Sequence, residues 1–251
     1  MTALLEDKAG LVTGAAGGIG RAVAVAAAQA GASVVIADLE SQRAKGEETV
    51  RLVQENGGEG RFVACDVTQP GECETLLAAT IAEFGRLDFA HNNAGIGSVG
   101  HIIDAEEAEF DRVLAVNLKG VWHGLRAQLP RMAAAGGGSI VNTASLAGLI
   151  GLPRGGAYAA SKHAVVGITK TAAVEWAPQN VRVNAVCPAA IATPMTDSLP
   201  EELREQALAP QAIRRFGQPH EVAAAVVWLC SDASSFVTGV AMPVDGGATA
   251  R

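Results

Sequence analysis

The sequence predicts an α/β fold in which a parallel sheet is covered by helices on both faces. Hydrophobic residues make up 49% of the chain and aromatic residues only 4%, so the core must consist of Ala, Val, Ile and Leu, as in sheets that are buried on both sides. Short apolar segments alternate with longer helical ones along the chain. The length of 251 residues suits a single domain of this class, and we expect residues 1–251 to form one.

The charge of the chain excludes several classes of partner. Its net charge is −7, and it has no basic block that would release counterions from a nucleic acid or bind an anionic membrane. The longest apolar run, residues 22–37, is interrupted by polar residues and glycine and is too short to cross a bilayer. The N-terminal MTALLEDKAG has acids where a signal peptide is apolar. We therefore expect a cytoplasmic protein with a small soluble partner.

The four cysteines, at positions 65, 73, 187 and 230, are scattered along the chain. They form no C-x-x-C pair and no Cys/His cluster with metal spacing. We therefore expect reduced thiols in a cytosolic compartment and no metal site.

The first strand ends at residues 11–13 and leads into a glycine-rich turn, GAAGGIG at residues 14–20, before a helix over residues 21–30. Glycines at such a turn let the backbone bend tightly and approach a pyrophosphate, while the helix N-terminus directs its amide hydrogens at the phosphates. The spacing is G-x-x-x-G-x-G rather than G-x-G-x-x-G. Taken alone, a turn of this kind can be purely structural.

The second strand, residues 33–37, ends in Asp38, eighteen residues after Gly20. A carboxylate at this point binds the hydroxyls of an adenosine ribose and repels a 2′-phosphate, so it favours NAD over NADP. Leu39 supplies no compensating cation, and Arg43 on the following helix is the nearest one. The alternative is that Asp38 is the N-cap of that helix.

The alternation continues with a helix over residues 41–55, a strand over 61–65, a helix over 70–84 and a strand over 87–91. Ligands bind at the carboxyl ends of parallel strands, where the chain has Asp66-Val67 and Asn92-Asn93-Ala94-Gly95. Asp66 can accept a hydrogen bond from an adenine amino group, and Asn93, Ala94 and Gly95 let the backbone pass close to a ribose. Either segment can also serve only as a turn.

Asp104 and Glu107 predict the capped start of a long helix over residues 105–133, with Asn117 inside an apolar stretch, VLAVNLKGVW. An amide in that setting requires hydrogen-bond partners, which can be structural. The strand over residues 139–143 then delivers Ser145 just past its end, thirteen residues before Tyr158. Both side chains can face one crevice, although serines at strand ends often only cap a turn.

Tyr158 is the only tyrosine of the chain, and Lys162 follows four residues later in a helix predicted over residues 157–177. Residues at this spacing share a helix face about 6 Å apart along the axis. An ammonium ~5 Å from a phenol, at an effective dielectric of ~20, favours the phenolate by roughly 3 kcal/mol, about two pKa units. Such a tyrosine can act as a general acid-base. Alone, however, Y-x-x-x-K is also compatible with an ordinary helix.

The chain ends with a strand over residues 181–186, an amphipathic segment over 195–213, a helix over 219–231 and a strand over 240–244. We expect residues 189–216 to form a substrate lid. The predicted pocket walls are apolar, and Arg154 is the only nearby cation, which disfavours a highly anionic substrate. The walls are Leu146, Leu149, Ile150, Leu152, Met195 and Leu199.

Together these residues resemble the classical short-chain dehydrogenase/reductase family, and the match runs through the whole chain. TGAAGGIG, Asp66, NNAG, Asn117, Ser145 and YAASK occur in that order at the spacing of the family. The resemblance implies a Rossmann-like, doubly wound parallel sheet of about seven strands. It also implies a homotetramer whose dimers join through the helices that carry Asn117 and Tyr158, where Trp122 and Trp176 fit an interface.

The resemblance also implies the role of each site residue. Tyr158 would be the general acid-base, Lys162 would lower its pKa and bind the nicotinamide ribose, Ser145 would fix the substrate oxygen, and Asn117 would hold a proton-relay water. Thr193 would bind the carboxamide beside Ile191. The expected cofactor-binding set is Gly14, Gly18, Ile19, Gly20, Asp38, Leu39, Asp66, Val67, Asn93, Ala94, Gly95, Tyr158, Lys162, Pro188, Ile191 and Thr193.

We therefore expect an oxidoreductase that transfers a hydride reversibly between NAD(H) and an apolar secondary alcohol or ketone. A 3-oxoacyl carrier-protein reductase is an alternative, although such enzymes usually use NADPH and Asp38 argues against it. A catalytically silent dinucleotide-binding regulator is another, but the four catalytic positions are complete. A serine hydrolase lacks its G-x-S-x-G motif. The sequence departs from the family at two positions. Ala189 stands in place of a glycine, and His91 stands in place of an apolar residue. The sequence assigns no role to His91.

Overall fold

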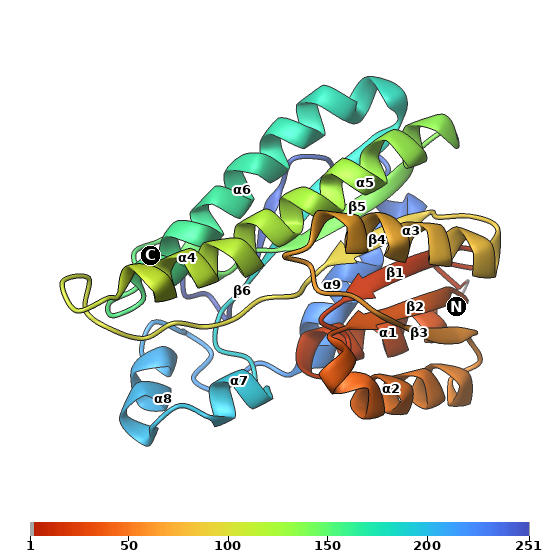
Figure 1. The fold of residues 1–251 in the computed structure, drawn as a ribbon. Coiled ribbons are helices and arrows are strands. Elements are labelled where there is room, and N and C mark those ends of the chain that lie inside the picture. The colour runs from red at the N-terminus through yellow and green to blue at the C-terminus, as the bar shows by residue number, and fades with distance from the viewer. Residues whose placement is uncertain (1–2, 251) are drawn as a thin grey trace.

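Seven parallel strands form the single sheet of the computed structural model, which describes residues 3–250. Their order across the sheet is β3-β2-β1-β4-β5-β6-β7, and every neighbouring pair is parallel. The predicted doubly wound sheet is therefore confirmed (Figure 1). The strands are β1 (Ala9–Thr13), β2 (Ser33–Asp38), β3 (Gly60–Ala64), β4 (Phe89–Asn92), β5 (Gly138–Thr143), β6 (Val181–Pro188) and β7 (Ala241–Val244).

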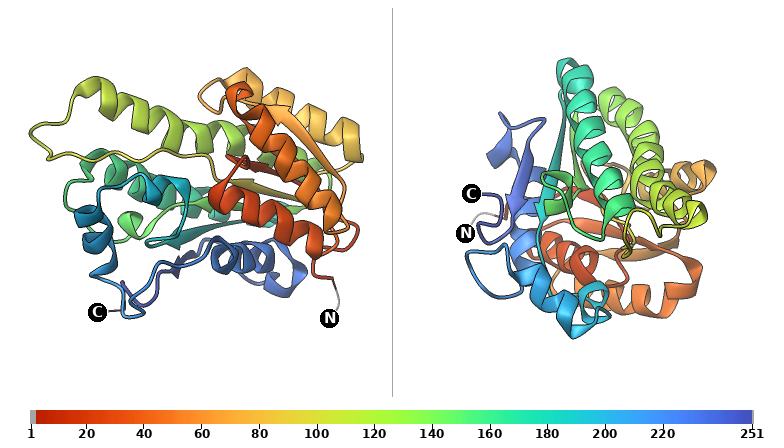
Figure 2. Two further views of the ribbon diagram at one scale, coloured as in Figure 1. Left: turned by 90° about the horizontal axis from the view of Figure 1, so that it is seen from below. Right: turned by 90° about the vertical axis from the view of Figure 1, so that its left-hand side faces the viewer.

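Helices cover both faces of the sheet, as Figures 1 and 2 show. One face is covered by α1 (Gly18–Gln29), α2 (Arg43–Glu55) and α9 (Pro219–Cys230), and the other by α3 (Pro70–Phe84), α5 (Gly120–Ala134) and α6 (Gly156–Trp176). Each face has its own apolar core, since the strands are buried on both sides.

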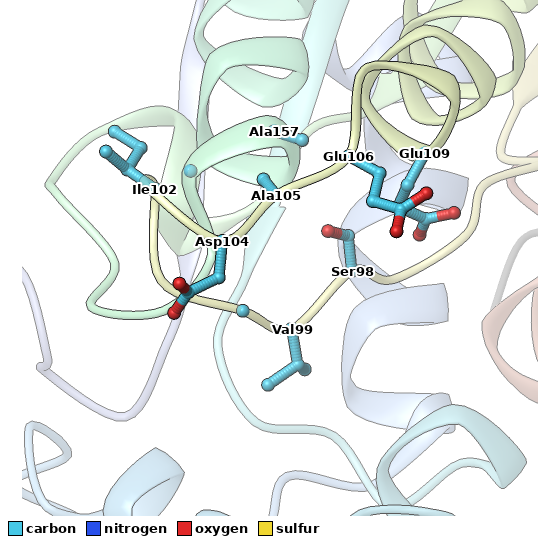
Figure 3. A pocket seen from close by; sticks show the side chains of 10 residues that line it. Ser98, Val99, Ile102, Asp104, Ala105, Glu106, Glu109 and Ala157 are labelled. Carbon is cyan, nitrogen blue, oxygen red and sulfur yellow. The ribbon is translucent and has the colours of Figure 1, made fainter.

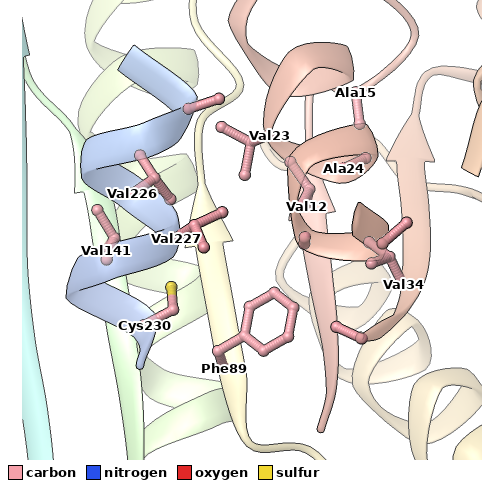
Figure 4. Packing of buried hydrophobic residues seen from close by; sticks show 14 of the residues in the cluster. Val12, Ala15, Val23, Ala24, Val34, Phe89, Val141, Val226, Val227 and Cys230 are labelled. Carbon is pink, nitrogen blue, oxygen red and sulfur yellow. The ribbon is translucent and has the colours of Figure 1, made fainter. Parts of the chain in front are cut away.

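The core beneath α1 and α9 consists mostly of Val and Ala, which lets the helices lie close to the strands (Figure 4). Val12, Phe89 and Val141 from adjacent strands meet Val23 of α1 and Val226 of α9. Burying one valine side chain contributes about 1.5–3 kcal/mol to the stability of the fold. Many such small side chains together can therefore stabilise the sheet without large aromatic residues.

The long helix predicted over residues 105–133 is interrupted. It consists of α4 (Glu107–Leu114), a π-helical turn (Ala115–Lys119) and α5, in direct succession. The predicted cap is wrong: the N-cap position is Glu106, without a side-chain hydrogen bond, and Asp104 lies in a preceding turn where its amide donates to the His101 carbonyl. Single π turns occur often at functional sites, and this one contains Asn117.

The predicted lid contains two short helices, α7 (Pro194–Asp197) and α8 (Glu201–Leu208). Its base is anchored to the rest of the protein. Gly217 donates to the Ala190 carbonyl, the buried Gln211 side chain accepts from the Ala190 amide, and Ile213 donates to Gly246. Within residues 3–250, no helix has both the length and the apolar character needed to cross a membrane.

Candidate active site

A cleft of about 1720 Å³ runs along the carboxyl ends of the strands. It crosses the position where β1 and β4 are neighbours and the strand order reverses, which is where open parallel sheets bind ligands. Of the predicted catalytic and cofactor-binding residues, only Gly20 and Asn117 do not line the cleft. Those that line it are Gly14, Gly18, Ile19, Asp38, Leu39, Asp66, Val67, Asn93, Ala94, Gly95, Ser145, Tyr158, Lys162, Pro188, Ile191 and Thr193.

The glycine-rich turn lies against the segment that follows β4. Gly14 has a φ of +64°, and a Cβ at this position would lie 2.9 Å from Ala94 Cα. A Cβ at Gly20 would lie 2.3 Å from the Gly14 carbonyl oxygen, so Gly20 supports the turn from beneath. Helix α1 begins at Gly18, three residues earlier than predicted, which places its N-terminal amides on the cleft. Such an N-terminus suits a phosphate group.

Asp38 is part of the cleft wall and is not the N-cap of the next helix. Its carboxylate accepts from the amides of Ala16 and Leu39, both at 2.9 Å, whereas the N-cap of the following short helical turn is Leu39. The carboxylate is thus fixed beside the glycine-rich turn.

The cation expected nearest to Asp38 is engaged elsewhere. Arg43 pairs with Glu40 and lies over the Phe62 ring, and it does not line the cleft. Arg21 and Lys45 do line it, and the sequence pattern does not predict either one, because their position depends on how α1 and α2 pack. Arg21 pairs with Glu48 at 3.0 Å.

Hydrogen bonds join the ends of β1 and β4. The Thr13 hydroxyl accepts from the amides of Asn93 and Ala94, and the Asn93 side chain donates to the carbonyls of Thr13 and Gly14. These groups are about 80 residues apart in the chain, with separations of 79 to 81. Hydrogen bonds therefore hold the backbone of the cleft wall in place at the ends of β1 and β4.

Tyr158 and Lys162 lie on the same face of α6, as predicted. The Lys162 ammonium donates to the Thr143 carbonyl at 2.7 Å and lies 5.6 Å from the centre of the Tyr158 ring. Burial lowers the pKa of Lys162 to about 8, so the side chain is mostly charged at neutral pH. The Gly95 backbone passes close by, since a Cβ there would lie 3.2 Å from Asn117 Oδ1 and 3.5 Å from Lys162 Nζ.

The expected lowering of the Tyr158 pKa is not found. Burial raises the pKa of Tyr158, and a hydrogen bond with Ser145 offsets part of that rise. Desolvation of the phenolate is the larger effect, and the Lys162 ammonium, which is held by the Thr143 carbonyl, does not offset it. The phenol is protonated at neutral pH, which is the form that donates a proton to a carbonyl oxygen.

Ser145 caps a turn and also faces the cleft, the two placements that the sequence left open. Its backbone is extended, and its hydroxyl accepts from the Ala147 amide at 3.1 Å, capping the short turn Leu146–Gly148. The same hydroxyl donates to the Pro188 carbonyl at 3.5 Å, lines the cleft and lowers the pKa of the neighbouring Tyr158 phenol. The cap fixes the position of the hydroxyl next to the phenol.

Asn117 lies behind the cleft wall and is fully buried. Its side-chain oxygen accepts from the Ile96 amide at 2.8 Å, and its nitrogen donates to the Ile96 carbonyl and to the Ser161 hydroxyl. Both amide hydrogens are used within the protein. The side chain therefore fixes the segment after Gly95 against α6.

The opposite wall of the cleft is apolar. Leu146, Ile150, Leu152, Met195 and Leu199 line it as predicted, together with Arg154, and Val99 and Leu203 of α8 add to it. The prediction that Leu149 lines the pocket is wrong, because Leu149 packs against the core beneath α6 and does not line the cleft.

A smaller pocket of about 230 Å³ adjoins the cleft at Ser98 and Val99 (Figure 3). It presents the carboxylates of Asp104, Glu106 and Glu109, of which Glu109 is paired with Arg112. In the part of the chain that the structure describes, no group of three or more His, Cys, Asp or Glu side chains is arranged to hold a metal ion. This pocket contains none of the predicted catalytic groups.

Comparison with known proteins places the chain in a family. Residues 14–249 match the family model described as enoyl-(acyl carrier protein) reductase. The 3-oxoacyl-[acyl-carrier-protein] reductase of Thermotoga maritima is 41% identical over 97% of this chain and 98% of its own. The cyclohexanol dehydrogenase of Acinetobacter sp. strain SE19 is 40% identical over 100% of this chain and 98% of its own.

Solved structures agree with this placement. The crystal structure of levodione reductase superimposes with a TM-score of 0.92 at 38% identity, covering 98% of this chain and 99% of that one. A short-chain type dehydrogenase/reductase from Mycobacterium marinum gives a TM-score of 0.93 at 36% identity, covering 100% and 98%. The chain therefore belongs to the short-chain dehydrogenase/reductase family of oxidoreductases, which bind nicotinamide dinucleotides.

Proposed function

We propose that this protein transfers a hydride reversibly between NAD(H) and an apolar secondary alcohol or ketone. The observation that carries the proposal is that the Tyr158 phenol, beside Ser145 and close to the Lys162 ammonium, opens onto an apolar cleft wall. When bound, the nicotinamide ring supplies or accepts the hydride. The protein then has to orient the substrate, move one proton and exclude water.

The proton step falls to Tyr158. In the reductive direction, the phenol donates its proton to the carbonyl oxygen of the substrate while Ser145 donates a hydrogen bond to the same oxygen. In the oxidative direction, Tyr158 takes the hydroxyl proton. Lys162, whose ammonium lies near the Tyr158 ring, would hold the nicotinamide ribose. The raised pKa of Tyr158 keeps the phenol protonated at neutral pH, and this is the form that the reductive direction requires.

The residues that would hold the dinucleotide fit it. The cradle formed by Gly14, Gly18 and Ala94 has no space for additional side-chain atoms at Gly14, and the N-terminus of α1 suits the pyrophosphate. Asp66 and Val67 would flank the adenine. Asn93, Ala94 and Gly95 would border the ribose, with Pro188, Ile191 and Thr193 at the nicotinamide end. We call the part of the cleft formed by these residues the nucleotide half. Residues 146–155 together with α7 and α8 form the substrate half.

The preference for NAD rests on Asp38, whose fixed carboxylate would repel a 2′-phosphate. Lys45 is the observation that favours a second candidate, since it lines the same end of the cleft. An NADPH-dependent 3-oxoacyl carrier-protein reductase is therefore the main competitor, and the Thermotoga maritima relative has that name. An enoyl reductase is disfavoured, because the resemblance implies more residues between its tyrosine and lysine than the three found here.

We further propose a cytoplasmic homotetramer that uses the exposed faces of α5 and α6. Trp122 on α5 is 42% exposed and Val174 on α6 is 78% exposed. Trp176 packs against the core beneath α6, so it contributes less to such an interface than expected.

The proposal is tested by following the near-ultraviolet absorbance of the reduced cofactor. NAD or NADP is mixed with aliphatic, cyclic, steroidal, sugar and 3-hydroxyacyl secondary alcohols. We expect reduction of NAD with an aliphatic or cyclic alcohol. Reduction of NADP with 3-hydroxyacyl substrates alone would favour the carrier-protein reductase, and silence despite NADH binding would favour a regulatory protein.

A further inference from the structure

His91 lies at the centre of the sheet and has a polar atom without a partner. Its side chain is fully buried, and its Nδ1 is the one buried side-chain nitrogen or oxygen that lacks a hydrogen bond among residues 3–250. Buried polar groups in proteins are nearly always paired. An imidazole at this position therefore needs an explanation.

The strand register shows where the imidazole points. His91 on β4 is aligned with Val12 on β1 and with Val141 on β5. Side chains two residues apart share a face of the sheet, so His91 faces the same side as Phe89, into the apolar layer beneath α1 and α9 that Figure 4 shows. Thr143, two residues after Val141, is on this face at the strand end.

The hydrogen bonds fix the tautomer of His91. The Asn93 side-chain nitrogen donates to the Thr13 and Gly14 carbonyls, so its oxygen faces Thr143 and can only accept. The Thr143 hydroxyl donates its single hydrogen to that oxygen at 3.2 Å. The contact of 2.8 Å between His91 Nε2 and the Thr143 hydroxyl oxygen must therefore have Nε2 as the donor.

His91 is neutral in this setting. Burial and, to a smaller extent, the charge of Lys162 lower the pKa of His91 to about 3. The imidazole is thus a fixed Nε2–H donor throughout the neutral range.

We propose that His91 is a positioning residue for the dinucleotide. Its donor orients the Thr143 hydroxyl, Thr143 orients the Asn93 side chain, and Asn93 holds the carbonyl of Gly14 at the start of the glycine-rich turn. The peptide of Thr143 also accepts from Lys162. This inference rests on the proposed function, because it assumes that a dinucleotide occupies the nucleotide half.

The unpaired Nδ1 separates this role from a structural one. Replacing His91 with leucine removes the unsatisfied acceptor and fills a similar volume in an apolar layer, so the fold should be no less stable. The same change removes the donor to Thr143. A residue kept for packing would show the reverse pattern, with lower stability and unchanged binding.

The experiment titrates the protein with NADH and with NADPH, following ligand fluorescence, and measures the melting temperature of each variant. We expect H91L to raise the Kd of the preferred dinucleotide about fivefold to tenfold, the worth of one hydrogen bond, without lowering the melting temperature. H91Q, whose side-chain amide can donate in place of Nε2, should restore much of the affinity. T143V should match H91L, and the double variant should be no worse than either single one.

F89L is the matched control, since Phe89 is on the same strand and face but its ring makes no hydrogen bond. It should lower the melting temperature and leave the Kd unchanged. Wild-type affinity in H91L, or equal losses in H91L and H91Q at normal melting temperature, would overturn the role of His91. Failure of the wild-type protein to bind either dinucleotide would instead contradict the proposed function.

Discussion

The nucleotide half of the cleft is held together by hydrogen bonds between backbone and polar side chains, whereas the wall of the substrate half is mostly apolar and lies on a short turn and two short helices. In the nucleotide half, Asp38 and Asn93 are held by hydrogen bonds to main-chain atoms. In the substrate half, Leu152, Met195 and Leu199 make their contribution through shape alone. A hydrogen bond requires a particular type of residue at a particular position, whereas an apolar wall can be built from many different residues. The nucleotide half can therefore be recognised from sequence motifs, but the substrate half can be recognised only from its apolar composition.

Removing the phenol where the two halves meet should have the largest effect. Y158F takes away the proton donor but keeps the ring, so turnover should fall by about 10² to 10⁴. NADH should still bind, because the nucleotide half is unchanged. Steady-state rates and a fluorescence titration check both points, and near-normal turnover would remove Tyr158 from its role.

Glycine substitutions compare the halves directly. G14A places a Cβ 2.9 Å from Ala94 Cα on a backbone with a φ of +64°, and we expect at least about a tenfold loss of NADH affinity together with lower stability. G151A in the substrate half meets nothing within 4 Å and should change neither. If G14A and G151A had the same NADH affinity and the same melting temperature, the proposed difference between the two halves would be contradicted.

Cofactor selectivity should depend on one carboxylate. D38A removes the negative charge that would face a 2′-phosphate, and we expect the preference for NAD to narrow by about tenfold, or roughly 1.4 kcal/mol. The ratio of kcat/KM with NAD and NADP measures it. An unchanged ratio would place selectivity elsewhere, with Lys45 as the next residue to vary.

The pH dependence of NADH binding should report Lys162. Because burial lowers its pKa to about 8, the ammonium that would hold the ribose is present below that pH and is lost as the pH rises through it. Affinity should therefore fall severalfold above about pH 8. K162M should bind weakly at every pH, and a wild-type affinity that stays constant up to pH 10 would argue against this role.

The smallest effect is expected in the substrate half. I150A enlarges the apolar wall, so it should change KM among alcohols of different size by about threefold to tenfold. NADH affinity should be unaffected, since Ile150 lies outside the nucleotide half. A loss of NADH binding in this variant would show that the halves are coupled.

The sequence predicted those elements that local patterns determine. Helix α3 has the predicted bounds, and the glycine-rich turn, Asp38, Tyr158 and Lys162 all lie on the cleft. The π turn at Asn117 was not predicted, because it lies in a nearly continuous apolar stretch, VLAVNLKGVW, where a shift of the helical period by one residue leaves no visible mark.

Long-range contacts account for the other differences. The raised pKa of Tyr158 depends on burial by distant segments, and Leu149 turns toward the core beneath α6. His91 interacts with Thr143, which is 52 residues away in the chain. Local sequence patterns show which residues are present, but they do not show which distant residues will be in contact after folding.

The most direct test of hydride transfer follows the atom itself. The protein is incubated with NADH that carries deuterium at the transferable position and with the ketone matching the best alcohol of the panel, and the product alcohol is analysed by mass spectrometry. We expect a single deuterium on the carbinol carbon, and almost none with Y158F in the same time. Product that forms without the label, or no product from any ketone while NADH binds, would contradict the account.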